Sequence, residues 1–112
     1  MPFKTTTSPL DICVLAVLSR GDTYGYMLTQ TVKEVIDVSE SSLYPVLRRL
    51  QRDGWLSVYE VPYSGRLRRY YTITDQGREA YAELISGWND FKNKIDTIIN
   101  SQETAKETTP NE

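Results

Sequence analysis

The chain has 112 residues, of which 39% are hydrophobic and 25% charged, and its formal net charge is −2. This balance is typical of one ordinary globular domain. The sequence contains no histidine, which excludes Ser-His and Cys-His catalysis and histidine-based metal sites, so we expect neither an enzyme nor a metal or cofactor site. The only cysteine, Cys13, excludes an internal disulfide and is expected to be a core thiol. The sequence has no apolar run long enough to span a membrane and no signal-peptide pattern.

The charge is distributed unevenly along the chain. Residues 41–78 carry seven arginines and three acidic side chains, a net +4, whereas the other residues carry a net −6. Every basic residue in that segment is arginine, which is well suited to bidentate contact with phosphate and guanine. A solvated charged surface could have the same composition, so the positions of the arginines decide between the two interpretations.

Two helices are predicted before the basic segment. Residues 1–8 are expected to form a short arm, and Pro9 fits the first position of a helix that continues through residues 10–18. This run is apolar on nearly every side, which favours contact with a second subunit. Asp22 or Thr23 can cap a second, short helix. Its apolar face is predicted from residues at helical spacing: Tyr24, Leu28, Val32 and Val35.

A third helix is predicted from about Ser41 to Asp53, and Gly54 is expected to end it. Pro45 is tolerable inside this segment if Ser41 or Ser42 caps the helix, because its missing N–H then falls close to the first turn. The predicted inward face is Leu43, Val46, Leu47 and Leu50. The predicted outward face is Ser41, Ser42, Pro45, Arg48, Arg49 and Arg52, with Tyr44 at the boundary.

A β-hairpin follows, with strands at residues 56–61 and 68–73 and a turn at residues 62–65. Its tip and returning strand carry three arginines: Arg66, Arg68 and Arg69.

Thr74 and Asp75 are then expected to cap a long helix that ends near Asn100. Its apolar residues alternate in spacings of three and four, which is typical of a coiled-coil seam between two subunits. This dimerisation seam is Tyr81, Leu84, Trp88, Phe91, Ile95 and Ile98. The polar residues 101–112 predict a disordered tail.

This order of elements predicts a mostly α protein with a small β-hairpin. We expect a winged helix-turn-helix DNA-binding domain at residues 1–73 and a C-terminal dimerisation helix at residues 74–100. The major groove of B-DNA admits one α-helix, whose first residues meet the base edges. The third helix would therefore enter the major groove, and the hairpin arginines would reach the adjacent minor groove or its phosphates.

Three stretches of the sequence also resemble a known family. GDTYGYMLTQTV, SSLYPVLRRLQRDGWL and RRYYTITDQGREAY are similar to the signature stretches of the PadR family of bacterial transcriptional repressors. The resemblance covers residues 10–85 and extends into the last helix, and the single C-terminal helix resembles the short PadR subfamily. It implies a cytoplasmic homodimer that binds an inverted-repeat operator in double-stranded DNA. The residues that match the DNA-contacting positions are Ser41, Ser42, Tyr44, Pro45 and Arg49 in the helix and Arg66, Arg68 and Arg69 in the wing.

The resemblance also implies a ligand site, because the short subfamily includes multidrug-sensing repressors. Trp88 matches a tryptophan that stacks on flat aromatic drugs in a pore between the subunits. The positions that match the rest of the pore are Ser8, Ile12, Leu15 and Ala16. Two departures bear on this site and on the wing. In the ligand site, Lys92 stands where an acidic residue can favour cationic drugs, which points to neutral or anionic ligands. In the wing, the sequence is SGRLRRYY rather than Gly-Gly followed directly by basic residues.

Three hypotheses follow from the sequence. The first is a homodimeric repressor that a small planar aromatic ligand releases from DNA. The second is a repressor with a simply packed interface and no ligand. The third is a protein-interaction module that keeps the winged-helix scaffold without binding DNA.

Overall fold

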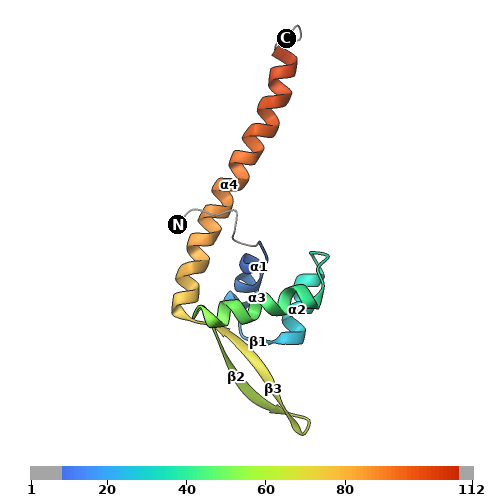
Figure 1. The fold of residues 1–112 in the computed structure, drawn as a ribbon, viewed down its shortest axis with the longest axis vertical. Coiled ribbons are helices and arrows are strands. Elements are labelled where there is room, and N and C mark those ends of the chain that lie inside the picture. The colour runs from blue at the N-terminus through green and yellow to red at the C-terminus, as the bar shows by residue number, and fades with distance from the viewer. Residues whose placement is uncertain (1–8, 109–112) are drawn as a thin grey trace.

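The computed structural model describes the backbone of residues 9–108 and the side chains of residues 9–101. The elements in chain order are α1 (Pro9–Ser19), β1 (Thr23–Tyr24), α2 (Gly25–Lys33), α3 (Glu40–Arg52), β2 (Leu56–Tyr63), β3 (Arg66–Ile73) and α4 (Asp75–Thr108) (Figure 1). This is the predicted winged-helix fold, mostly α with one small antiparallel sheet. The expected arm at residues 1–8 lies outside the described residues. No helix in the described part of the chain has both the length and the apolar character that a membrane span requires.

The core forms around α1, which packs against α2, α3, α4 and β3, while α3 packs against β2. The predicted inward face of α3 is confirmed, because Leu43, Val46, Leu47 and Leu50 are all buried. The apolar face of α2 is correct at Leu28 and Val32 but wrong at Val35, which is 85% exposed. The reason is that α2 ends at Lys33, so Val35 no longer follows the helical spacing.

The start of α3 differs from the prediction. Ser39, not Ser41 or Ser42, is the N-cap, and its hydroxyl accepts the backbone N–H of Ser42 at 3.2 Å. Pro45 therefore lies inside the helix, beyond its first turn. The carbonyl of Ser41, which a residue with an N–H at position 45 would bond, belongs to an exposed residue that water can reach.

The sheet has three strands in the order β1-β3-β2, and its third strand was not predicted. Thr23 and Tyr24 pair with Tyr71 and Tyr70 of β3. The N-cap of α2 is Tyr24, without a side-chain cap hydrogen bond, and not Asp22 or Thr23 as expected. The hairpin turn is shorter than expected, because β2 extends to Tyr63. Ser64 and Gly65 have φ values of 50° and 81°, which is the conformation of a two-residue type I′ turn.

The last helix begins as predicted, since the Thr74 hydroxyl accepts the backbone N–H of Gly77 at 2.9 Å. Gly77 is required there, because a Cβ at this position would overlap the carbonyl oxygen of Trp55. The helix does not end near Asn100 but continues to Thr108, so the expected disordered tail is wrong for residues 101–108. Its far half projects from the rest of the molecule (Figure 1), whose longest extent is 72 Å.

Candidate nucleic-acid interface

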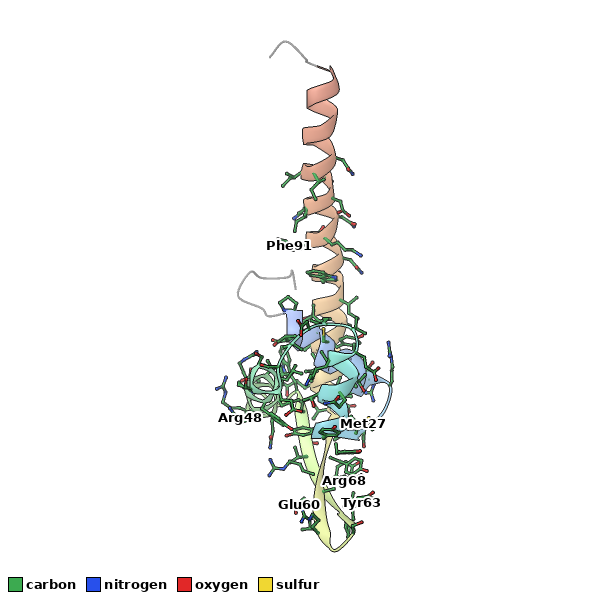
Figure 2. The ribbon with its side chains drawn as sticks, turned by 90° about the vertical axis from the view of Figure 1, so that its right-hand side faces the viewer. Met27, Arg48, Glu60, Tyr63, Arg68 and Phe91 are labelled. Atoms are coloured by element: carbon green, nitrogen blue, oxygen red, sulfur yellow. The ribbon has the colours of Figure 1, made fainter. Side chains whose placement is uncertain are left out.

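The outer face of α3 presents most of the residues predicted to meet DNA. Ser41, Ser42, Pro45, Arg48 and Arg52 are exposed, and Figure 2 shows Arg48 pointing away from the helical core. A helix turns by about 100° per residue, so residues 41, 45, 48 and 52 fall on one stripe opposite the buried leucines. The Arg52 side chain is free to move, because its ion pair with Asp53 is long, at 3.4 Å, and exposed.

Arg49 does not share this outward direction. Its guanidinium lies against the first turn of α1, where Nη2 and Nη1 donate to the two carboxylate oxygens of Asp11 at 2.7 and 3.0 Å. Asp11 is only 4% exposed, and its hydrogen bonds raise the pKa of Arg49. The expectation that Arg49 faces outward is therefore wrong. Its position is one helical step beyond the outward stripe, where α1 packs against α3.

The two faces of the sheet separate the wing arginines. Successive residues of a strand point to opposite faces, so Arg69 shares the core-side face of β3 with the buried Tyr71, and Arg68 lies on the outer face with Tyr70. Arg69 and the tip residue Arg66 are exposed, whereas Arg68 is partly covered. We refer to Arg48, Arg52 and Arg69 as the arginine surface.

A pocket of about 430 Å³ joins α3 to the hairpin of β2 and β3. It opens where β1 stops and leaves the edge of β3 uncovered, next to the first residues of α2. Its lining combines three arginines with aromatic residues: Tyr24, Gly25, Tyr26, Tyr44, Arg48, Arg68, Arg69 and Tyr71. Tyr24 and Tyr26, for which the sequence favours packing and phosphate contacts, border this pocket on either side of Gly25.

The residues of the expected ligand pore differ from one another in how exposed they are. Leu15 is fully buried in the core of the protomer, which removes it from any surface that a ligand could reach. Ile12 and Ala16 of α1 are partly exposed, as is Trp88 of α4, and Lys92 is exposed. Ser8 lies outside the described residues. Cys13 is half-buried, and desolvation raises the pKa of its thiol, as expected for a core thiol.

The expected dimer seam divides into two parts. Leu84 is buried in the core of its own protomer, contrary to the prediction, whereas Tyr81 packs against that core and stays partly exposed. Trp88 and Phe91 follow on the same face of α4, with ring centroids 6.5 Å apart. Ile95 and Ile98 are exposed, and so is Ile99.

Comparison with known proteins finds relatives that are similar in sequence and in fold. The chain is 40% identical over 64 residues to the transcriptional regulator Rv3488 of Mycobacterium tuberculosis (strain ATCC 25618 / H37Rv), a match that covers 56% of this chain and 60% of that protein. The structure of smu.1704 from Streptococcus mutans UA159 matches with a TM-score of 0.75 and 38% identity over 81% of this chain and 86% of that one. Bacillus subtilis PadR in complex with operator DNA has a similar fold, with a TM-score of 0.64 and 22% identity over 70% of this chain and 47% of that one.

The family comparison covers both α3 and the hairpin of β2 and β3. Residues 14–83 match the family described as the transcriptional regulator PadR-like family. This family consists of transcriptional regulators and not of enzymes. Since the match spans more than half of the sequence and runs from α1 into α4, the chain belongs to the PadR-like family of transcriptional regulators.

Proposed function

We propose that this regulator represses transcription by binding an inverted-repeat operator as a homodimer. The observation that carries the proposal is the pocket in which Arg48 of α3 and Arg69 of β3 border one concave surface. Arginines from two different elements converge there although the chain as a whole is acidic. Guanidinium groups arranged in this way suit the closely spaced phosphates on the two sides of a DNA groove.

In the proposed complex, α3 lies in the major groove. Its exposed first residues, Ser41, Ser42 and Pro45, are small and allow the helix to approach the base edges closely. Arg48 and Arg52 follow at intervals of about one turn and reach the phosphates or a guanine. The wing lies beside the groove with Arg69 and Arg66, and Tyr44 lines the pocket between the two elements.

The far half of α4 supports the dimer. Beyond Trp88, α4 extends away from the rest of its own protomer. Exposed apolar side chains nevertheless continue along it at Ile95, Ile98 and Ile99. An exposed row of large aliphatic side chains is stable when a second apolar surface covers it. Two copies paired through α4 present two recognition helices, as an inverted repeat with half-sites one helical turn apart requires.

We further propose that a planar aromatic ligand binds beside Trp88 and lowers operator affinity. Trp88 is partly exposed and lies one turn beyond Leu84, where α4 leaves the core. Ile12 and Ala16 present partly exposed apolar surface on α1, which packs against α4. A ligand between two protomers at this level would change the separation of the two recognition helices and thereby favour the unbound state.

The experiment is a fluorescence-anisotropy titration of a labelled duplex from the region upstream of the protein's own gene. A scrambled duplex of equal length is the control. The proposal predicts tighter binding to the upstream duplex, and weaker binding to both duplexes as salt increases, because phosphate contacts release counterions. Failure to bind either duplex at low salt would contradict the proposal and would favour a protein-interaction module.

A further inference from the structure

Arg68 has a different environment from the other wing arginines. Its guanidinium carbon lies 3.9 Å from the ring centroid of Tyr24 and 3.5 Å from that of Tyr63, so two aromatic faces hold it. Tyr24 belongs to β1 and immediately precedes α2, whereas Tyr63 ends β2 beside the hairpin turn. One side chain therefore connects the tip of the wing to the body of the domain.

The outer face of the sheet extends this contact into a row of rings. Tyr24, Tyr70 and Tyr59 are paired across the three strands. Tyr70 lies 5.7 Å from Tyr24, and it stacks on Tyr59 at 5.6 Å with an interplanar angle of 17°. The hydroxyl of Tyr59 donates to the carboxylate of Asp22 at 2.7 Å, which joins the row to the loop before β1.

The hairpin needs such a contact because the third strand is short. β1 pairs only with Tyr70 and Tyr71, so residues 60–69 form a two-stranded ribbon beyond the three-stranded part of the sheet. An isolated two-stranded hairpin is marginally stable in water. Stacking of a guanidinium on aromatic rings is favourable even at exposed sites, so the contact of Arg68 with Tyr24 and Tyr63 favours one orientation of this ribbon relative to the domain.

Arg68 borders the pocket between α3 and the wing, but it lies on the opposite face of β3 from Arg69. Figure 2 shows Arg68 beside Tyr63 on one side of the hairpin and Glu60 on the other, on the side where Arg48 projects from α3. Glu60 pairs with Arg69 across the two strands. Arg69 and Arg68 therefore lie on opposite faces of the ribbon although they are neighbours in sequence.

We propose that Arg68 is a positioning residue, which fixes the wing against the start of α2 through Tyr24 and Tyr63 and does not itself bind a phosphate. This inference rests on the proposed DNA-binding function, and it divides the wing arginines by role. Arg69 supplies charge to the groove, and Arg68 holds the wing at the angle that brings Arg69 there. We call the stack of Arg68 on Tyr24 and Tyr63 the clamp. Without it Arg69 can still contact phosphate, but the wing must then be ordered when DNA binds, which lowers the affinity.

The test measures operator affinity over a series of salt concentrations. Each phosphate contact contributes about 0.9 to the slope of log K against log salt, so Arg69→Ala lowers the slope by about 1.8 for the two wings of a dimer. Arg68→Ala is expected to weaken binding several-fold while the slope changes by less than half of the Arg69→Ala effect. A decrease in slope of half that effect or more would overturn the proposal.

Two further variants separate stacking from charge. Arg68→Lys keeps the charge but loses the planar group, and Tyr63→Leu removes one ring and leaves every charge in place. Both are expected to weaken binding about as much as Arg68→Ala. Wild-type affinity in either variant would show that the stack is not needed.

A DNA-free measurement keeps this inference distinct from the proposed function. Amide hydrogen exchange of residues 62–69 should become faster in Arg68→Ala and stay unchanged in Arg69→Ala. If exchange is equal in the two variants, the clamp is disproved whether or not the wild type binds DNA. If exchange differs but the wild type binds no duplex, the clamp stands and the proposed function fails.

Discussion

Asp11 and Arg49 form a bidentate ion pair that joins the first turn of α1 to α3. The two hydrogen bonds measure 2.7 and 3.0 Å, and the side chain of Asp11 is 5% exposed against 37% for Arg49. A buried carboxylate is stable only where a partner compensates its lost hydration. Arg49 supplies that compensation, so its first role is to hold α3 against α1.

The first prediction is that Arg49→Ala destabilises the fold. The variant leaves the buried carboxylate of Asp11 without its guanidinium, which should cost about 2–3 kcal/mol, below the usual cost of breaking a buried pair because Arg49 is partly exposed. Urea denaturation followed by circular dichroism measures this. Arg48→Ala, which alters the exposed neighbour, should change the free energy of unfolding by less than about 0.5 kcal/mol. Equal stability of the two variants would contradict the role of the ion pair.

A second prediction concerns the start of α4. Gly77→Ala places a methyl group against the carbonyl oxygen of Trp55 and close to the side chain of Ile73. The backbone must move to relieve the overlap, so we expect a loss of about 1–3 kcal/mol, although alanine is ordinarily the better helix former. Ser86→Ala, at an exposed position of the same helix, is the matched control and should not destabilise. A Gly77→Ala protein as stable as wild type would show that this contact is not close.

The third prediction tests the far half of α4 as the dimer contact. Ile98 is 64% exposed in the protomer, and Ile98→Glu would place a carboxylate in an apolar interface. A cost of about 3 kcal/mol or more corresponds to a dimer dissociation constant raised by about 100-fold or more. Sedimentation equilibrium measures it, with Asn93→Glu as a control away from the seam. A dimer that is equally tight in both variants would place the interface elsewhere.

The fourth prediction concerns the ligand beside Trp88. The anionic aromatic probe 1-anilinonaphthalene-8-sulfonate should quench tryptophan fluorescence, because Lys92 lies one turn beyond Trp88 and favours a negative charge. Trp88→Phe should abolish the quenching, and Trp55→Phe should retain it, since Trp55 packs against the core. Quenching that survives Trp88→Phe would move the ligand away from α4.

The helices were predictable because helical spacing of apolar residues determines which face is buried. Leu43, Val46, Leu47 and Leu50 form such a face, and Gly54, with a φ of 84°, ends the helix as expected. The strand β1 was not predictable, because two residues carry no periodicity and pair only after β3 is in place. The end of α4 was also missed, since a polar composition fits an exposed helix as well as a disordered segment.

The sequence predicted that arginines are concentrated in the candidate site, but it did not predict the direction in which each arginine side chain points. The sequence places seven arginines between residues 41 and 78, yet it does not show that Arg49 meets Asp11, 38 positions away. It also does not show that Arg68 meets the rings of Tyr24 and Tyr63. These are long-range contacts between side chains, which local patterns cannot encode. For the same reason the burial of Leu15 and Leu84 within the protomer was missed.

The central claim is that two copies of this chain bind one operator through paired arginine surfaces. Light scattering coupled to size-exclusion chromatography measures it directly, because the mass of the complex gives the number of 12.9 kDa chains on a duplex of known mass. The account predicts two chains on one upstream duplex. A complex with a single chain on the duplex, or elution of protein and DNA as separate species at low salt, would contradict it.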